Sequence, residues 1–259
     1  MAESAVMRLE VMLPEIVNFE ERGIFSKEEL KVIMAHRRKH EYSIASRAAK
    51  LDDYMSYISH EIRTEIDRRE RYAKLNIKKE TPRDFTIVQR IHYLFSRCLS
   101  KYSSDVSVWT QYIEFCVTSG SSSAMTRTIM RAIKRHPRVA SFRIMAADRE
   151  LQLGNLLSAR KLLMLAVRAK TDNRCLIWEQ LFKLECLALY RKLVVPEAGP
   201  ESTAAAMVVV RHAMVDLAEH GGQERFLTFC RCAFEGLELS LMGFPHPSGM
   251  DRLRDMIVV

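Results

Sequence analysis

One spacing of bulky side chains recurs along the chain at intervals of about 34 residues. In each copy, positions i, i+3 and i+7 lie on one face of a helix. From Trp109 to Arg143 is 34 positions, and from Arg143 to Trp178 is 35. The copies are Tyr54, Tyr57 and Glu61; Trp109, Tyr112 and Cys116; Arg143, Ala146 and Glu150; and Trp178, Leu181 and Glu185.

A second pattern interleaves with the first and has the same period. Its copies begin at Phe95, Ile129 and Leu163, spaced by 34 and 34 positions. Two patterns that share one period predict a unit of two helices and two short turns. We expect the large side chain of the first helix to fill the gap to its partner, while a small residue at i+3 of the second pattern lets the helices approach closely. The small residues are Cys98, Ala132 and Ala166.

The turn signals and the composition agree with stacked helix pairs. Residues 119–123, a serine-rich run, separate the helices of one unit, Gly154-Asn155 separates those of the next, and Pro137 ends a second helix. Nine glycines and seven prolines in 259 residues favour helices over turn-rich sandwiches and barrels. The sequence therefore predicts an all-α fold of antiparallel helix pairs.

Three segments are expected along the chain. Residues 1–50 form an N-terminal helical arm, residues 51–195 form the repeat helix pairs, and residues 196–259 form a further helical segment of divergent or truncated repeats. The first pair is longer than the others, because 41 positions separate Tyr54 from Phe95. The excess is rich in charged residues and predicts an extended charged helix followed by a loop.

Charge and hydropathy restrict the partners that the chain can have. The formal charge of +8 arises from 40 basic and 32 acidic residues, so the positive excess is diluted over surfaces of mixed sign. This charge permits contact with RNA without establishing it. No apolar run is long enough for a membrane span, and the first residues lack the parts of a secretory signal. We expect an intracellular protein without membrane contact.

Metal, cofactor and disulfide motifs are missing from the sequence. The six cysteines show no CxxC spacing and have apolar neighbours, so we expect buried thiols. His36 and His40 stand at i and i+4, a spacing that can bind a metal ion, but no third ligand is evident. The chain also has no GxGxxG, Walker A, HExxH or nucleophile-elbow motif. We predict no catalytic, cofactor-binding or metal-binding residue.

Residues at shared repeat positions are expected to serve packing. Glu61, Glu150 and Glu185 belong to three different units, so pairing with neighbouring helices is favoured over acid–base catalysis. Trp109 and Trp178 can in principle stack on nucleic acid bases, but aromatic residues at such positions usually form the core. We interpret both kinds of residue as structural.

Two basic groups are candidates for contact with phosphate. Residues 36–40 form the densest basic run, which also suits a nuclear import signal or a solvated helix face. The second group lies on and after the helix that contains Ile129. The candidates for contact with RNA or a partner protein are Arg37, Arg38, Lys39, Arg135 and Arg138.

The two interleaved patterns resemble the half-a-TPR (HAT) repeat, which is common in RNA-processing assemblies. This resemblance implies a right-handed, TPR-like α-α superhelix. The amino-terminal segment is more specific, and it resembles one family, the HAT-repeat subunit of the small-subunit processome that is associated with the U-three small nucleolar RNA. The matching residues are 13–15, 21–26, 40–42, Arg47 and 53–61, with 144–147, Glu150 and 158–160 further along.

The family resemblance implies a non-enzymatic, nucleolar scaffold. Such a scaffold is held among WD40-propeller subunits and acts in pre-18S ribosomal RNA processing and small-subunit assembly, with pre-ribosomal RNA or the U-three RNA as a further contact. Two alternatives stay open, namely a HAT-repeat scaffold of a splicing or polyadenylation assembly, and a direct pre-ribosomal RNA-binding protein. The chain is shorter than expected for the family, and Arg143 departs from it at an aromatic position.

Overall fold

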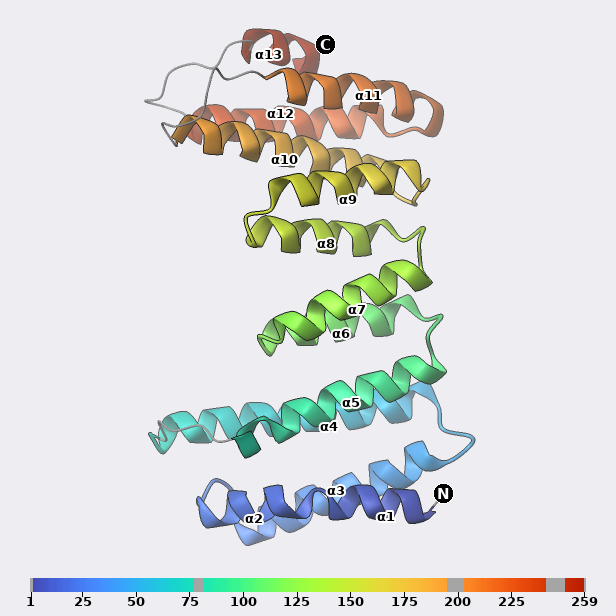
Figure 1. Cartoon of the computed structure of the whole chain (residues 1–259), viewed down its shortest axis with the longest axis vertical. Coiled ribbons are helices and arrows are strands. Elements are labelled where there is room, and N and C mark those ends of the chain that lie inside the picture. The colour runs from blue at the N-terminus through green and yellow to red at the C-terminus, as the bar shows by residue number, and fades with distance from the viewer. Residues whose placement is uncertain (1, 77–81, 195–202, 241–249, 259) are drawn as a thin grey trace. The chain divides into compact units, whose positions relative to one another are not determined.

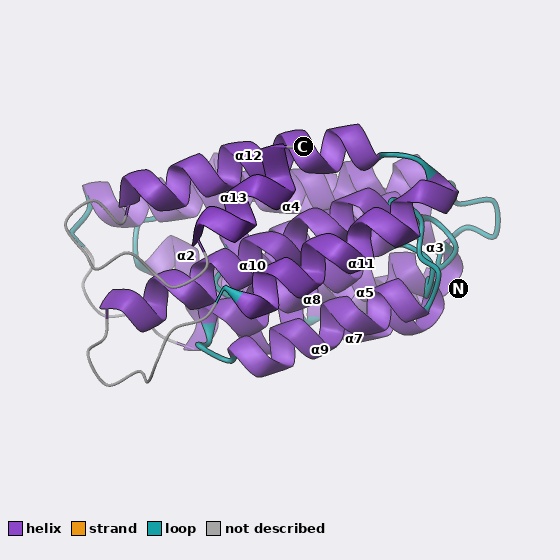
Figure 2. Ribbon diagram, turned by 90° about the horizontal axis from the view of Figure 1, so that it is seen from above, coloured by secondary structure: helices purple, strands orange, loops and turns teal. Residues whose placement is uncertain are grey.

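The computed structural model describes residues 2–76, 82–194, 203–240 and 250–258. These residues form α-helices and one 3-10 helix, with no strand among them (Figures 1 and 2). The predicted all-α fold is therefore confirmed. The helices are α1 (Ala2–Glu10), α2 (Leu13–Glu21), α3 (Lys27–Ala45), α4 (Leu51–Lys74), η1 (Pro82–Phe85), α5 (Thr86–Lys101), α6 (Val106–Thr118), α7 (Ser122–Arg135), α8 (Ala140–Gln152), α9 (Leu156–Arg168), α10 (Arg174–Val194), α11 (Ala204–His220), α12 (Gln223–Ser240) and α13 (Met250–Val258).

The helices form two compact units, Met1–Ser122 and Ser123–Val259. The boundary falls within the segment 51–195 that was predicted to hold all the repeat pairs. The predicted division into arm, repeats and carboxy-terminal segment stays a prediction, and its second boundary lies at residues outside the described ones. The pairing of α6 with α7 and the hand of the superhelix also stay predictions.

In the first unit, successive helices pack on one another. Helices α1 and α2 lie against α3, α3 packs on α4, α4 on α5, and α5 on α6. Local capping defines where these helices begin. The Ser26 hydroxyl accepts a hydrogen bond from the Glu29 backbone N–H at 3.2 Å, and the Glu29 carboxylate accepts one from the Ser26 N–H at 2.8 Å, which completes a capping box at α3. Asp105 caps α6 by accepting the Ser107 N–H at 2.9 Å.

Helix α4 accounts for the predicted insertion. It runs for 24 residues, well past the repeat positions Tyr54 and Glu61. Its buried face continues through charged side chains, because Arg68 donates two 2.8 Å hydrogen bonds to Glu65 on the same helix. The predicted extended charged helix is thus confirmed, whereas the loop that follows it falls at residues 77–81, outside the described part of the chain.

In the second unit, α8 and α9 form a hairpin at the predicted Gly154-Asn155 turn. Gly154 has a φ of +84°, a left-handed conformation that strains any residue with a Cβ. Its N–H donates to the Leu151 carbonyl at 3.0 Å, and the Asn155 N–H donates to the Glu150 carbonyl at 2.8 Å. These bonds satisfy carbonyls at the end of α8, which explains the sharp reversal of the chain.

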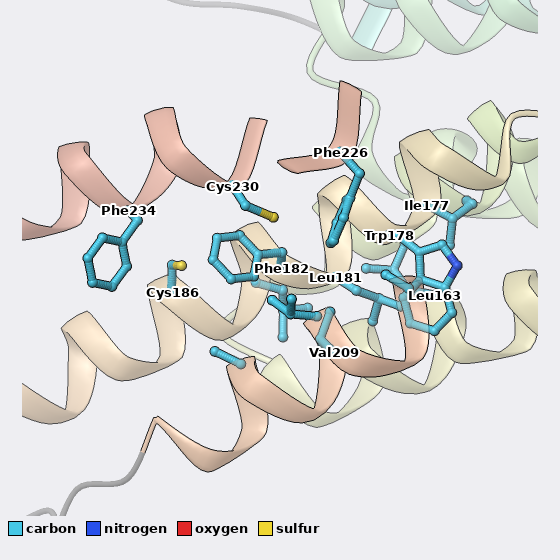
Figure 3. Close-up of a cluster of buried hydrophobic side chains, with 14 of the residues drawn as sticks. Leu163, Ile177, Trp178, Leu181, Phe182, Cys186, Val209, Phe226, Cys230 and Phe234 are labelled. Carbon is cyan, nitrogen blue, oxygen red and sulfur yellow. The ribbon is translucent and has the colours of Figure 1, made fainter. Parts of the chain in front are cut away.

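The core of the second unit extends from α8 to α13. Helix α10 lies at its centre and contacts α8, α9, α11 and α12. Trp178 and Phe182 of α10 point into the core, where Phe182 meets Phe226 of α12 edge to face at 6.4 Å between ring centroids (Figure 3). Ala166 on α9 is fully buried, as the packing of a small residue between helices requires. This apolar cluster ties α9 to α12 through α10.

Two leucines of α9 offer a direct test of this packing. Leu163 is 2% exposed and Leu165 is 48% exposed. We expect Leu163→Ala to lower the free energy of unfolding by about 3 kcal/mol, because it removes buried methyl groups and leaves a cavity. Leu165→Ala should change that free energy by less than about 0.5 kcal/mol. Urea unfolding followed by circular dichroism measures both, and equal effects would contradict the orientation of α9.

Candidate interaction surfaces

A buried network of two arginines and two glutamates lies in the first unit and draws on four helices. Arg37 of α3 donates to both carboxylate oxygens of Glu61 on α4, from Nε at 2.8 Å and from Nη2 at 2.9 Å. Arg90 of α5 donates to Glu61 at 3.1 Å. Glu15 of α2 accepts hydrogen bonds from both arginines. The side chains of Arg37 and Glu61 are 0% exposed, so their charges are compensated only within the protein.

The pairing keeps the buried carboxylate ionised. Burial opposes the ionisation of Glu61, but the guanidinium groups of Arg37 and Arg90 outweigh it and lower the pKa of Glu61 from 4.5 to about 2. In return, and also against the effect of burial, Glu61 and Glu15 raise the pKa of Arg90 above its ordinary value. The network depends on the registers of α2, α3, α4 and α5 together, since removal of one partner leaves a buried charge unpaired.

The buried position of Arg37 corrects one prediction from the sequence. Arg37 was a candidate for contact with RNA, but it has no exposed surface and its cation is already paired. Helical spacing explains this position, because Leu30, Arg37 and Ile44 follow one another at seven-residue intervals on the buried face of α3. Arg38 and Lys39 are exposed, and their contact with RNA stays a prediction.

Helix α7 carries the second basic group on its exposed side. Its buried face consists of Met125, Thr128, Ile129 and Ala132. The helix contains no acidic residue, and its four basic residues are exposed between Arg127 and Arg135, so the solvent side is positive from Arg127 to the carboxyl end. Arg135 and Arg138 lie exposed at and just after its carboxyl end, and their contact with RNA also stays a prediction.

The residues predicted to pack the repeats lie inside the two units, with Glu150 half-buried. Phe95 stacks on Tyr112 with 4.7 Å between ring centroids. The Trp109 indole donates to the Ser103 carbonyl at 2.9 Å, and the Trp178 indole donates to Asp216 at 2.8 Å, so both tryptophans are core residues. The fully or nearly fully buried members are Tyr54, Tyr57, Glu61, Phe95, Cys98, Trp109, Tyr112, Ala132, Ala166, Trp178, Leu181 and Glu185.

The glutamates at the shared repeat position pair with neighbouring groups. Glu185 accepts two hydrogen bonds of 2.6 Å from Arg160 on the preceding helix, in the same way that Glu61 accepts two from Arg37. Glu150 accepts one from Asn155 at 3.0 Å, just beyond the end of its own helix. Glu61 and Glu185 therefore bond to a neighbouring helix, whereas Glu150 bonds to the turn that follows its own helix, and a shared packing role for the three glutamates stays a prediction.

Arg143 stands where other copies of the repeat have an aromatic residue, and the packing of α8 does not fully accommodate its side chain. Arg143 takes the position that Trp109 and Trp178 hold in other copies, and it is half-buried. Its Nε is buried without a hydrogen-bond partner among the described residues. Burial lowers the pKa of its guanidinium, consistent with a cation in a slot built for an aromatic ring.

The prediction that the cysteines are buried holds for four of the six. Cys98, Cys116, Cys186 and Cys230 are buried as predicted, and burial raises the pKa of Cys98 to about 11. The prediction is wrong for Cys232, which is exposed, and only partly met by Cys175, which is half-buried.

Three histidine rings of the first unit lie near one another. The ring of His60 lies 4.9 Å from that of His36 and 5.8 Å from that of His40 between centroids. Even so, no group of three or more metal-ligating side chains is placed to hold a metal ion in the part of the chain that the structure describes.

Sequence patterns missed two polar clusters that join distant segments. Glu15 and Arg90 complete the network around Glu61, and neither stands at a repeat position. Asp84 of η1 accepts hydrogen bonds from Arg22 at 2.7 and 2.9 Å and from the hydroxyl of Tyr72. No periodic signal could have paired these residues, because 62 positions separate Arg22 from Asp84.

Comparison with known proteins identifies relatives. Residues 9–90 match the family model described as U3 small nucleolar RNA-associated protein 6. The protein of that name from Schizosaccharomyces pombe is 33% identical over 187 residues, which cover 71% of this chain and 38% of the relative. The homolog from Mus musculus is 30% identical over 191 residues (72% and 32%), and that from Homo sapiens is 30% identical over 196 residues (74% and 30%). The chain thus spans about a third of the length of these relatives.

Stacked helix pairs with a recurring buried glutamate define an all-α helical-repeat protein. No helix among the described residues is long and apolar enough to cross a membrane. The match over residues 9–90 and the similarity to these relatives indicate the family within this class. The chain belongs to the U3 small nucleolar RNA-associated protein 6 family.

The buried network generates a prediction about stability and pH. We expect Glu61→Gln to lower the free energy of unfolding at pH 7 by about 3 kcal/mol, because two buried arginines lose a shared counter-charge. The pKa of Glu61 is lowered on folding, so its contribution is complete above the unfolded value of 4.5 and is lost as the pH falls toward 2. The difference in Tm between wild type and Glu61→Gln should therefore shrink below pH 4.5.

Glu28 provides the matched control on the exposed face of α3. Glu28→Gln removes the same charge without touching the network, so we expect a change within about 0.5 kcal/mol. Thermal unfolding of the three proteins at several pH values between 7 and 3 makes the comparison. A difference between wild type and Glu61→Gln that stays constant over this range would contradict an ionised, paired Glu61.

Proposed function

We propose that this chain is a non-enzymatic scaffold subunit of the small-subunit processome. In this role it acts in the nucleolus, in processing of pre-18S ribosomal RNA and assembly of the small ribosomal subunit. The family match over residues 9–90 is the observation that carries the proposal. Those residues contain α2, α3 and α4 and all four residues of the network around Glu61, so buried charge helps to fix the helix registers of the matched region.

The architecture supports a scaffold because helix stacking creates extended surfaces. Each helix of a stacked array buries one face and leaves another for partners. The names of the relatives link them to the U3 small nucleolar RNA, and their family is not one of known enzymes. We propose WD40-propeller subunits of the processome as the protein partners of this chain. Pre-ribosomal RNA or the U3 small nucleolar RNA is a further contact in this proposal.

Affinity purification of the tagged full chain tests the scaffold proposal. We expect WD40 subunits of the processome and the U3 small nucleolar RNA to co-purify, and a fluorescent fusion to accumulate in the nucleolus. The Glu61→Gln variant should recover less of both, because it weakens the matched region, whereas Glu28→Gln should behave as wild type. Recovery of splicing or polyadenylation factors with a nucleoplasmic signal would instead favour the alternative of another HAT-repeat assembly.

Direct binding of pre-ribosomal RNA is the second candidate function. The positive side of α7, which contains no acidic residue, favours it. Arg38 and Lys39 on α3 form another exposed basic pair. Side chains of this kind bind phosphate by releasing counterions, so such binding weakens steeply as salt increases.

Charge reversal separates this candidate from the scaffold proposal. We expect Arg38→Glu with Lys39→Glu, or Arg135→Glu with Arg138→Glu, to reduce ultraviolet crosslinking to RNA and to lower the salt dependence of binding by about one unit for each phosphate that is no longer neutralised. Arg37 is left unchanged because its substitution would disrupt the buried network. Lys31→Glu, an exposed change on α3, is the control. Unchanged crosslinking in both double variants would exclude these two groups as the RNA site.

A further inference from the structure

Helices α9 and α11 each expose large aliphatic side chains to solvent. The exposed fractions reach 67% for Leu157 and 70% for Val215. We call the exposed faces of these two helices the α9–α11 surface. Its aliphatic members, all at least 39% exposed, are Leu157, Met164 and Leu165 on α9 and Val208 and Val215 on α11.

These aliphatic residues alternate with basic residues at helical spacing. On α9, Leu157, Lys161, Met164 and Arg168 stand at i, i+4, i+7 and i+11, and this stripe lies opposite the buried residues of the helix. On α11, Val208, Arg211 and Val215 stand at i, i+3 and i+7. Each helix therefore carries an exposed stripe that is both apolar and positive.

Nearby carboxylates do not cancel this charge along most of the surface. Helix α9 contains no acidic residue. On α11, Asp216 is occupied by the Trp178 indole at 2.8 Å and by Arg174 at 3.1 Å. Glu219 is exposed, but it lies in the last turn of α11. Positive charge thus predominates along α9 and at Arg211 near the middle of α11.

A small apolar groove opens between the amino-terminal ends of α9 and α11, with α10 as its floor. Its volume is about 220 Å³, below the roughly 300 Å³ at which small-molecule sites begin, and better suited to a single anchoring side chain. The doubly hydrogen-bonded pair of Arg160 and Glu185 fixes one side of the groove. The apolar lining residues are Leu156, Leu157, Ala188, Leu189, Ala205 and Ala206.

The chemistry of this surface favours a protein over RNA. Single exposed aliphatic residues are normal, but aligned ones beside a groove mark interaction sites. Aliphatic side chains neither neutralise phosphate nor offer an aromatic face for bases. An amphipathic helix docks through apolar anchors at i, i+3, i+4 and i+7 of its own sequence. The receiving surface here offers exposed aliphatic residues seven positions apart on each helix, Leu157 and Met164 on α9 and Val208 and Val215 on α11. Acidic residues flanking such anchors would complement Lys161, Arg168 and Arg211.

We propose that the α9–α11 surface docks an acidic amphipathic helix of a partner protein. One apolar side chain of that helix enters the groove between α9 and α11, and its carboxylates pair with Lys161, Arg168 and Arg211. This inference deepens the scaffold proposal, on which it rests only in requiring that the chain bind proteins. It does not require that the partner be a subunit of the processome.

Fluorescence anisotropy with the full 259-residue chain tests the proposal. The probe is a labelled, designed helical peptide with leucines at i, i+4 and i+7 and glutamates on both flanks. A second peptide has every glutamate replaced by lysine, and a single-stranded uridine oligonucleotide is the third probe. We expect the acidic peptide to bind at least about tenfold more tightly than the basic one, with affinity that decreases as salt increases. Equal binding of the two peptides, or binding of the oligonucleotide alone, would overturn the proposal.

Substitutions at exposed positions locate the binding site without disturbing the core. We expect Leu165→Glu with Val208→Glu to weaken binding of the acidic peptide at least about tenfold. The matched control is Val117→Glu, because Val117 on α6 is 62% exposed and belongs to the first unit. Circular dichroism should show all variants folded. Equal weakening by the control, or no weakening by the double variant, would contradict the assignment.

Charge reversal gives a readout that loss of folding cannot mimic. Lys161→Glu with Arg211→Glu should weaken the acidic peptide and strengthen the basic one, which inverts the preference. A preference that stays unchanged would count against the proposed pairing. The outcome is separate from that of the scaffold proposal. If the chain binds the acidic peptide but no processome subunits co-purify with it, only the scaffold role is refuted. If the subunits co-purify but the chain does not bind the peptide, only this site is refuted.

Discussion

Each helix pair in this chain leaves an apolar face that only the next element can cover. In the second unit this requirement is met around α10, which has neighbours in α8, α9, α11 and α12. Small residues such as Ala166 permit close approach, and large ones such as Trp178 and Phe182 fill the space that remains. Stability in such an array is a sum of interactions between neighbours, so the removal of one buried side chain is felt by the elements on both sides of it.

Apolar packing alone tolerates sliding of one helix past another, and the buried charges of the first unit oppose it. The ion pairs around Glu61 form only when Glu15, Arg37 and Arg90 arrive together from three other helices. Buried ion pairs add little net stability compared with apolar side chains of similar size, but a wrong register leaves a charge unpaired at high cost. We therefore interpret the network as a device that specifies helix register. The pairing of Glu185 with Arg160 has the same form in the second unit.

The surfaces left by this packing differ in chemistry. The exposed side of α7 combines basic residues with little apolar surface, since Met130 is its one large aliphatic residue exposed within the described chain. Helix α9, also without acidic residues, adds Leu157 and Leu165 to its positive charges. A charge-only surface suits phosphate, whereas a surface that also removes aliphatic groups from water on binding suits a protein. One scaffold can therefore present separate faces to RNA and to protein partners.

The sequence by itself determined the all-α class, the turn at Gly154 and the burial of repeat residues such as Trp109 and Glu185, because helical periodicity and turn chemistry are local properties. The buried position of Arg37 was also readable in principle, from its seven-residue spacing to Leu30 and Ile44, although its basic neighbours suggested the opposite. Only the tertiary structure decided that Glu15 and Arg90 meet at Glu61, since contacts between helices distant in the chain leave no periodic trace. The groove between α9 and α11 depends in the same way on how α10 holds both helices, which no single helix encodes.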